Sequence, residues 1–225
     1  TGTRLRALRT TGKPLPQAAP QGSHCHGPLV STARGWCAKG GQGIVYLTNL
    51  IAEAAVISGI PVCVSEIHGL SQRGGTVTAG IGLGEFNTGF TGKANVDFLI
   101  GLEPLETQRC TNFIHRQSVV IFGNNKILPH SVNAGQVQYP DTNSFTDYLN
   151  GQCKKVVYVD EFPAGINTIH HNVFFVGIAS GINEFPLSVQ SIEEAISRTV
   201  PEIQIRQTLN AFRMGYEYLI NPQTV

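Results

Sequence analysis

The sequence lacks the features that define several classes of protein. Its most apolar stretch, residues 173–182, has about half the length that a membrane-spanning helix needs, and glycine and serine interrupt it. The five cysteines lie far apart and form no CxxC pair. The sequence therefore indicates neither a disulfide framework nor a run of iron–sulfur ligands. We expect a soluble protein without a membrane span, in a reducing, cytoplasmic setting.

No acidic residue precedes Glu53, although the net charge of the whole chain is only +1. Residues 1–37 also contain several prolines and no strong hydrophobic period, which is typical of irregular structure. We interpret them as a basic N-terminal arm that lies on the surface or wraps a partner; an uncleaved targeting segment is the alternative. Contact with nucleic acid is disfavoured, because the arm has too few aromatic rings to stack bases. The basic residues before Glu53 are Arg4, Arg6, Arg9, Lys13, Arg34 and Lys39.

The rest of the chain has the composition of a globular α/β protein. Its 225 residues, 41% of them hydrophobic, suffice for one domain with a sizeable core. Strand and helix periods alternate early and helices dominate late, which predicts a single three-layer α/β/α domain over residues 38–225, with a mainly parallel or mixed sheet. The predicted strands are 61–65, 77–83, 95–102, 118–122 and 155–159. The predicted helices are 44–57, 104–116, 172–182, one capped by Ser188 or Ser191 and one opened by Pro201, with a long connection at 126–143 and a helical turn at 144–149.

A glycine-rich turn precedes the first predicted helix. Such a turn at a helix start favours anion binding, because free backbone N–H groups point outward along the positive end of the helix dipole. The alternative is a tight turn that only lets the helix pack on the sheet. The full dinucleotide fingerprint is absent, because Ala38 occupies the place of its first glycine. The candidate ligand-binding residues here are Lys39, Gly40, Gly41, Gln42 and Gly43.

A second loop combines functional side chains with three glycines where an apolar strand ends, so that we expect a sharp loop from Glu66 onward. The planar guanidinium group of Arg73 can form two parallel hydrogen bonds with a carboxylate or a phosphate. The alternative role for Arg73 is a surface ion pair. His68 has the chemistry to exchange protons near neutrality, and a structural histidine is the alternative. Together with the glycine turn, this loop predicts one site built from two loops. Its candidate residues are Glu66, His68, Gln72, Arg73, Gly74 and Gly75.

The sequence also contains residues typical of two other kinds of site. Glu66 lies 23 residues after Gly43, close to where a nicotinamide-dinucleotide fold places its ribose-binding carboxylate, so an NAD-binding Rossmann dehydrogenase is one alternative. The residues after Glu66 and the lack of a clean apolar strand before the turn count against it. Histidines and cysteines at 24–26, 37 and 170–171 match no common zinc spacing. We therefore predict no metal site.

Three motifs resemble the gamma-type subunit or domain of 2-oxoacid:ferredoxin oxidoreductases. They are K-G-G-Q-G-I at residues 39–44, S-E-I-H-G-L-S-Q-R-G-G-T-V at residues 65–77 and N-A-F-R-M-G-Y at residues 210–216. The second motif is close to the pattern S-E-x-H-G-M-x-Q-R-G-G-x-V of the indolepyruvate branch and differs from the P-E-x-R-G-G form of the pyruvate branch. The likeness covers about residues 38–220. One departure is that the family begins with an apolar strand, which this sequence does not clearly contain.

The resemblance implies a subunit of a complex that decarboxylates a 2-oxoacid on thiamine diphosphate, passes electrons through iron–sulfur clusters and releases an acyl-coenzyme A. The family then places thiamine diphosphate, magnesium and the iron–sulfur clusters in partner subunits, one thiamine diphosphate-binding and one ferredoxin-like, with ferredoxin or NAD as final acceptor. This chain would be inactive alone and would contribute coenzyme A binding and assembly. A purely structural interaction subunit is the remaining alternative.

Overall fold

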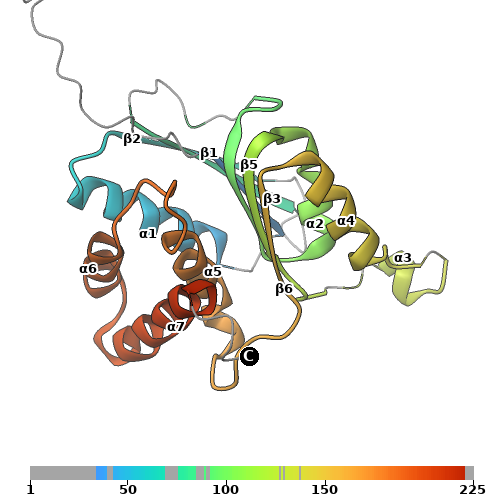
Figure 1. The fold of residues 1–225 in the computed structure, drawn as a ribbon. Helices are drawn as coiled ribbons and strands as arrows, with labels where there is room; N and C mark the ends of the chain where they lie inside the picture. Colours follow the sequence, from blue (N-terminus) through green and yellow to red (C-terminus); the bar gives the residue numbers. More distant parts are fainter. Residues whose placement is uncertain are drawn as a thin grey trace, which may run out of the picture.

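The computed structural model describes residues 34–39, 43–68, 76–84, 89, 92–126, 128, 130–136 and 138–220. These residues form one six-stranded mixed sheet between two layers of helices (Figure 1). The predicted three-layer α/β/α architecture is therefore confirmed. The first 33 residues, which contain most of the predicted basic arm, lie outside the described part of the chain.

The sheet has the strand order β2-β3-β1-β4-β5-β6. β3 pairs antiparallel with both β1 and β2, whereas β1, β4, β5 and β6 pair in parallel. Parallel pairing buries both faces of β4 and β5, which explains their long runs of β-branched and aromatic residues. The strands are β1 (Arg34–Lys39), β2 (Val62–His68), β3 (Thr76–Leu83), β4 (Val96–Gly101), β5 (Ile114–Gly123) and β6 (Lys155–Val159).

Helices cover the two faces of the sheet unequally (Figure 1). The larger core lies between the sheet and α1 (Ile44–Ile57), α5 (His171–Ser180), α6 (Val189–Thr199) and α7 (Glu202–Ile220). A smaller core lies on the opposite face, beneath α2 (Pro104–Arg109) and α4 (Thr142–Gln152), with the short α3 (His130–Asn133) beyond them. Two 3-10 helices, η1 (Thr111–Phe113) and η2 (Thr168–His170), complete the elements.

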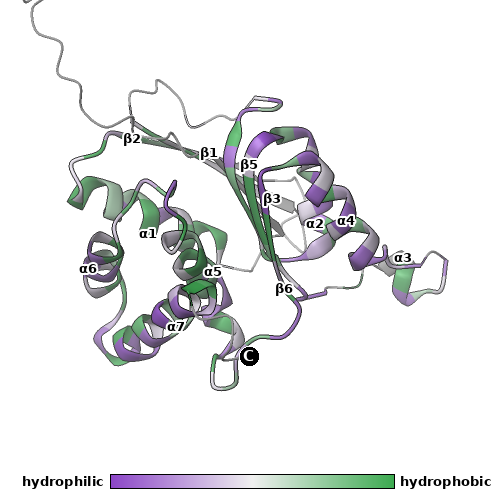
Figure 2. Ribbon diagram, viewed as in Figure 1, coloured by the Kyte–Doolittle hydropathy of each residue, from purple (hydrophilic) through white to green (hydrophobic). Residues whose placement is uncertain are grey.

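Helix α5 is buried on almost all sides, because the sheet lies below it and α7 packs across it. Figure 2 accordingly shows α5 as mostly hydrophobic, whereas α6 and α7 carry hydrophilic residues on their outer faces. Two glycines permit the close crossing of α5 and α7. A Cβ atom at Gly177 would overlap the carbonyl oxygen of Phe212, and one at Gly215 would overlap that of Phe174. Gly215, within the motif at residues 210–216, therefore serves helix packing.

Four local predictions were wrong. β1 begins at Arg34, inside the segment predicted to be irregular; pairing on both sides with β3 and β4 stabilises this strand without a clear apolar pattern. β2 continues to His68, so Glu66 lies in a strand and not in a loop. The helix predicted over 104–116 ends at Arg109, because Ile114 onward pairs with β4. The connection at 126–143 contains α3, and α4 begins at Thr142.

None of the helices in the described ranges is long and apolar enough to cross a membrane. Cys63 and Cys153 are not disulfide-bonded. Cys110 is disulfide-bonded, which the wide spacing of the cysteines did not predict.

Candidate functional site

The carboxyl ends of the four parallel strands meet at one edge of the sheet. The register pairs Cys37 of β1 with Gly101 of β4, and Gly123 of β5 with Val159 of β6. After β1 the chain enters α1 on one face, and after β4 it enters α2 on the opposite face. The crevice between β1 and β4 is therefore a topological switch point, the place where open α/β sheets bind their ligands.

The strand register also brings the ends of the two predicted site loops together. Lys39, the last residue of β1, pairs with Thr76 at the start of β3, and Val77 next to it pairs with His68 at the end of β2. The ends of β1 and β2 and the start of β3 thus lie at the same edge of the sheet. The predicted site residues Gly40, Gly41, Gln42, Gln72, Arg73, Gly74 and Gly75 lie outside the described residues, and their role stays a prediction.

Glu66 occupies a place that does not suit a ribose-binding carboxylate. It is half-buried within β2 and pairs with Ala79 of β3. Because β3 lies between β2 and β1, Glu66 is two strand spacings, about 10 Å, from the strand that leads into the glycine turn. In a dinucleotide-binding fold the strand with this carboxylate neighbours the first strand directly. The topology therefore counts against the NAD-binding alternative.

Helix α1 begins at Gly43, whose backbone has the left-handed angles φ 75 and ψ 25. Glycine favours this conformation, because a Cβ atom makes it strained. No described side chain caps the helix, and its first turn contains no acidic residue. The amide groups of this 14-residue helix therefore present the positive end of its dipole at the switch point.

The start of α5 contacts three of the segments at this edge. The side-chain amide of Asn172 donates to the carbonyl oxygen of Gly43 at 3.2 Å. The ring of His171 stacks on Phe162, which follows β6, with 3.6 Å between ring centroids. Its Nδ1 lies 2.8 Å from the side-chain nitrogen of Asn125, which follows β5. Sequence reasoning missed this role; the only signal was a polar triplet before an apolar helix.

Burial and the neighbouring His170 lower the pKa of His171, which favours its neutral form. The stacking on Phe162 and the contact with Asn125 occupy the ring, so His171 has a structural role. Within the described residues, no three histidine, cysteine, aspartate or glutamate side chains gather in a way that would hold a metal ion.

The buried carboxylate of Glu103 fixes the segment that connects β4 to α2. One oxygen accepts from the backbone N–H of Glu106 at 2.8 Å and so caps α2. The other accepts a hydrogen bond from the hydroxyl of Tyr139, which in turn accepts from the N–H of Leu105 at 3.2 Å. Burial and the bond to Glu103 raise the pKa of Tyr139. The long connection that contains Tyr139 is therefore tied to the switch-point edge.

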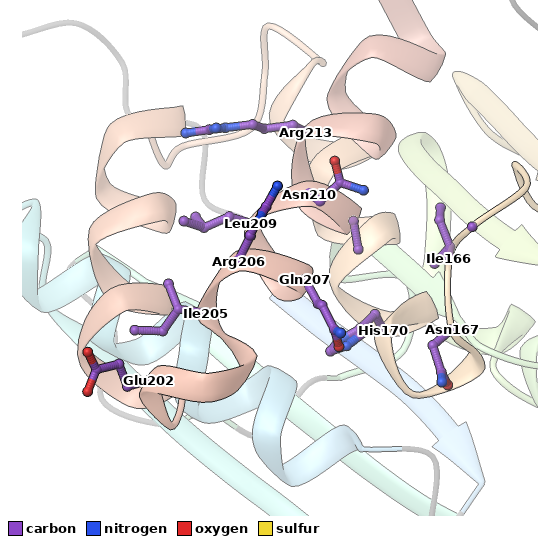
Figure 3. A pocket seen from close by; sticks show the side chains of 12 residues that line it. Ile166, Asn167, His170, Glu202, Ile205, Arg206, Gln207, Leu209, Asn210 and Arg213 are labelled. Carbon is purple, nitrogen blue, oxygen red and sulfur yellow. The ribbon is translucent and has the colours of Figure 1, made fainter.

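A groove of about 1040 Å³ lies between α7 and the segment before α5 (Figure 3). It contains none of the residues predicted from the sequence to form the site. Arg213 on its rim pairs with Glu193 at 2.7 Å. His170 also lines the groove, and its buried Nε2 atom has no hydrogen-bond partner among the described residues. The groove is also lined by Gly165, Ile166, Asn167, Glu202, Ile205, Arg206, Gln207, Leu209, Asn210 and Ala211.

Solved structures of known proteins share this fold. The gamma subunit of a keto/oxoacid ferredoxin oxidoreductase from Geobacter sulfurreducens aligns with a TM-score of 0.60 at 18% identity, covering 84% of this chain and 98% of its own. A 2-oxoglutarate:ferredoxin oxidoreductase from Magnetococcus marinus, solved with 2-oxoglutarate, coenzyme A and succinyl-CoA bound, aligns with a TM-score of 0.57 at 14% identity. That alignment covers 84% of this chain and 31% of the Magnetococcus chain.

Sequence comparison gives closer relatives. The indolepyruvate oxidoreductase subunit IorB of Archaeoglobus fulgidus is 32% identical over 186 residues, which cover 81% of this chain and 92% of the relative. The same subunit of Methanothermobacter thermautotrophicus is 30% identical, with 80% and 93% covered. The model of the pyruvate ferredoxin/flavodoxin oxidoreductase family matches residues 35–218. The resemblance seen in the three motifs is thus confirmed, and the chain belongs to the pyruvate ferredoxin/flavodoxin oxidoreductase family.

Proposed function

We propose that this chain is the non-thiamine-binding, gamma-type subunit of an oxidoreductase that converts an aryl pyruvate or aryl glyoxylate into an acyl-coenzyme A. In this reaction, coenzyme A takes up the acyl group, carbon dioxide leaves, and two electrons pass to the acceptor. The observation that carries the proposal is the meeting of the two loop-bearing strand ends, at Lys39 and His68, beside the uncapped start of α1. The relatives named as indolepyruvate oxidoreductase subunits support the aromatic substrate class.

The share of this chain would be to bind and orient coenzyme A. The phosphates of coenzyme A are anions that suit backbone N–H groups at a helix start together with Lys39. Arg73 offers a bidentate contact to a phosphate or to a neighbouring subunit, and Gln72 and His68 lie in the same stretch. The Magnetococcus enzyme of this fold has coenzyme A bound, which supports the assignment.

The redox and decarboxylation chemistry belongs, in this proposal, to partner subunits. Thiamine diphosphate and magnesium would be held by one partner and the iron–sulfur clusters by a ferredoxin-like partner, with ferredoxin or NAD as the final acceptor. We also propose a cytoplasmic location for the complex, which fractionation of cells with an antibody against this chain would test. Copurification of a thiamine diphosphate-binding chain and a ferredoxin-like chain would test the partners.

The functional test uses the complex reassembled from coexpressed subunits. Gly41→Val crowds the turn and Arg73→Ala removes the fork, so we expect each to raise the KM for coenzyme A about tenfold, the effect of about 1.4 kcal/mol of lost binding. Steady-state kinetics with coenzyme A varied at saturating oxoacid measures this. Arg206→Ala, on the groove of α7, is the matched arginine control and should leave this KM unchanged.

Unchanged coenzyme A kinetics in variants of Lys39, Gln42 and Arg73 would instead favour a purely structural role. The NAD-binding alternative has its own test, because it requires that the isolated chain bind NADH. The separation of Glu66 from the glycine turn by β3 predicts no saturable binding in a fluorescence titration. Micromolar affinity would contradict our assignment.

A further inference from the structure

We propose that Asn172 is a positioning residue for the glycine turn. Its side-chain amide holds the carbonyl group of Gly43 and so fixes the direction in which α1 leaves the turn. The contact joins positions 129 residues apart in the sequence, and both belong to the described part of the chain. The link to coenzyme A rests on the proposed function, whereas the contact itself does not.

Both ends of the Asn172 amide are used, which fixes its orientation. Nδ2 donates to the Gly43 carbonyl oxygen at 3.2 Å, and Oδ1 accepts from the N–H of Val173 at 2.8 Å. The residue is only 3% exposed, so water does not compete strongly for these bonds. Rotation of the amide by half a turn would place Oδ1 against another carbonyl oxygen and leave both contacts unsatisfied.

Gly43 is shaped to receive this side chain. A Cβ atom at position 43 would lie 2.5 Å from Asn172 Nδ2, closer than real Cβ contacts come. The left-handed φ of 75 adds backbone strain to any substitution. A side chain at position 43 would therefore displace the group that holds its carbonyl.

The contact is additional to the hydrogen bonds of the helix. The carbonyl oxygen of Gly43 also accepts from the N–H of Leu47 at 2.9 Å, the first bond of α1. A carbonyl oxygen has two lone pairs, so it can accept both hydrogen bonds. Loss of Asn172 should thus leave α1 formed and loosen only its first turn. That turn lies at the switch point, where we place the phosphates of coenzyme A.

The experiment compares Asn172→Ala with Asn167→Ala. Asn167 is a matched control, because its Oδ1 also accepts a backbone N–H at a helix start, that of Ile169 at 3.1 Å, but it makes no contact with Gly43. Hydrogen–deuterium exchange of the full chain, read by mass spectrometry of overlapping peptides, should be about tenfold faster at the Leu47 amide, the first hydrogen-bonded amide of α1, in Asn172→Ala only. In the assembled complex, Asn172→Ala should raise the KM for coenzyme A about tenfold and change kcat less than twofold.

A double variant makes the test more specific. Gly43→Ala alone should impair the KM for coenzyme A, but in the Asn172→Ala background it should add only the smaller effect of backbone strain, because the clash with Nδ2 is gone. Should Asn172→Ala not fold, Asn172→Ser keeps an acceptor for the N–H of Val173 but is too short to hold Gly43, and the same measurements apply.

The outcomes separate this inference from the proposed function. Unchanged exchange at the Leu47 amide in Asn172→Ala, or an equal increase in Asn167→Ala, would overturn the positioning role. Faster exchange with an unchanged KM would overturn its link to coenzyme A. If Gly41→Val and Arg73→Ala also leave the KM unchanged while exchange accelerates, the proposed function fails and the Asn172–Gly43 contact stands.

Discussion

At the scale of single residues, the switch-point edge is held by side chains whose chemistry is fixed by burial. His171 illustrates this, since its ring is packed flat against Phe162 and contacts Asn125, with little room for solvent. A buried imidazole resists protonation, because the charged form loses its hydration. The residue therefore makes the stability of this edge dependent on pH.

His171 should lower stability in mild acid. Its folded-state pKa is lowered, so below about pH 6.5 the unfolded chain takes up a proton that the folded chain does not, and the free energy of unfolding decreases as the pH falls. His171→Gln and His171→Phe remove the titrating ring, and the second keeps an aromatic stack. Both should reduce the loss of stability between pH 7.5 and 5.5, by up to about 1 kcal/mol, in urea unfolding. A pH dependence identical to that of the wild type in both variants would show that His171 contributes nothing.

Residue patterns predicted some of these positions well and others poorly. Gly43 was expected at the first turn of the helix, because a glycine after a glycine pair and before an apolar period is a strong local signal, and the structure has it at the N-cap. Asn172 could not be assigned to the turn from sequence, because its partner lies far away and an asparagine at a helix start is equally well explained as a cap. Contacts of this kind depend on the tertiary arrangement alone.

At the scale of elements, the crossing of α5 and α7 is the tightest helix contact on the larger face. These two helices meet at Gly177 and Gly215, where the backbone of each lies against the other. Gly215 belongs to the motif at residues 210–216, one of the three that resemble the oxidoreductase family. Gly215 is buried where a Cβ atom would overlap the carbonyl oxygen of Phe174, so packing against α5 requires this glycine.

Adding a methyl group at this crossing should destabilise the fold. Gly177→Ala places a Cβ atom on the carbonyl oxygen of Phe212, which forces the helices apart and should cost about 3 kcal/mol of unfolding free energy. Gly151→Ala is the matched control, because this glycine lies in α4 with open space around its Cβ position. There the substitution should stabilise by about 0.5 to 1 kcal/mol through helix propensity. Chemical denaturation measures both, and equal effects would contradict the packing explanation.

Elements with a strong hydrophobic period were predicted correctly. The predictions were wrong where strand pairing determines the bounds of an element. The helix at 44–57 and the strand at 155–159 have the predicted bounds, because each has a clear apolar period. β1 was missed, since a central strand gains its stability from two ladders of backbone hydrogen bonds and needs little from its own side chains. β2 is an edge strand with a single neighbour, and it continues past Glu66 to His68 because these residues still pair with β3.

At the scale of the whole molecule, the strand order brings together the strand ends that border the two predicted site loops, namely the ends of β1 and β2 and the start of β3, which no sequence motif shows. The sequence predicted that the loops form one site, but the strand order that makes this geometry had no local signal. β3 enters the sheet between β2 and β1 and runs antiparallel to both, which brings its start back to the end of β1. This insertion also distinguishes the sheet from a dinucleotide-binding fold.

The domain should fold stably without its N-terminal arm. The buried residues described for both hydrophobic cores lie from Ile44 onward, and the family match covers residues 35–218. A chain that begins at residue 34 should therefore keep its thermal unfolding midpoint within about 3 °C, a change of less than about 1 kcal/mol for a domain of this size. If the basic arm wraps a partner, as we propose, the same truncation should weaken copurification with the other subunits. A large loss of thermal stability would instead make residues 1–33 part of the domain, and unchanged assembly would remove the proposed role of the arm.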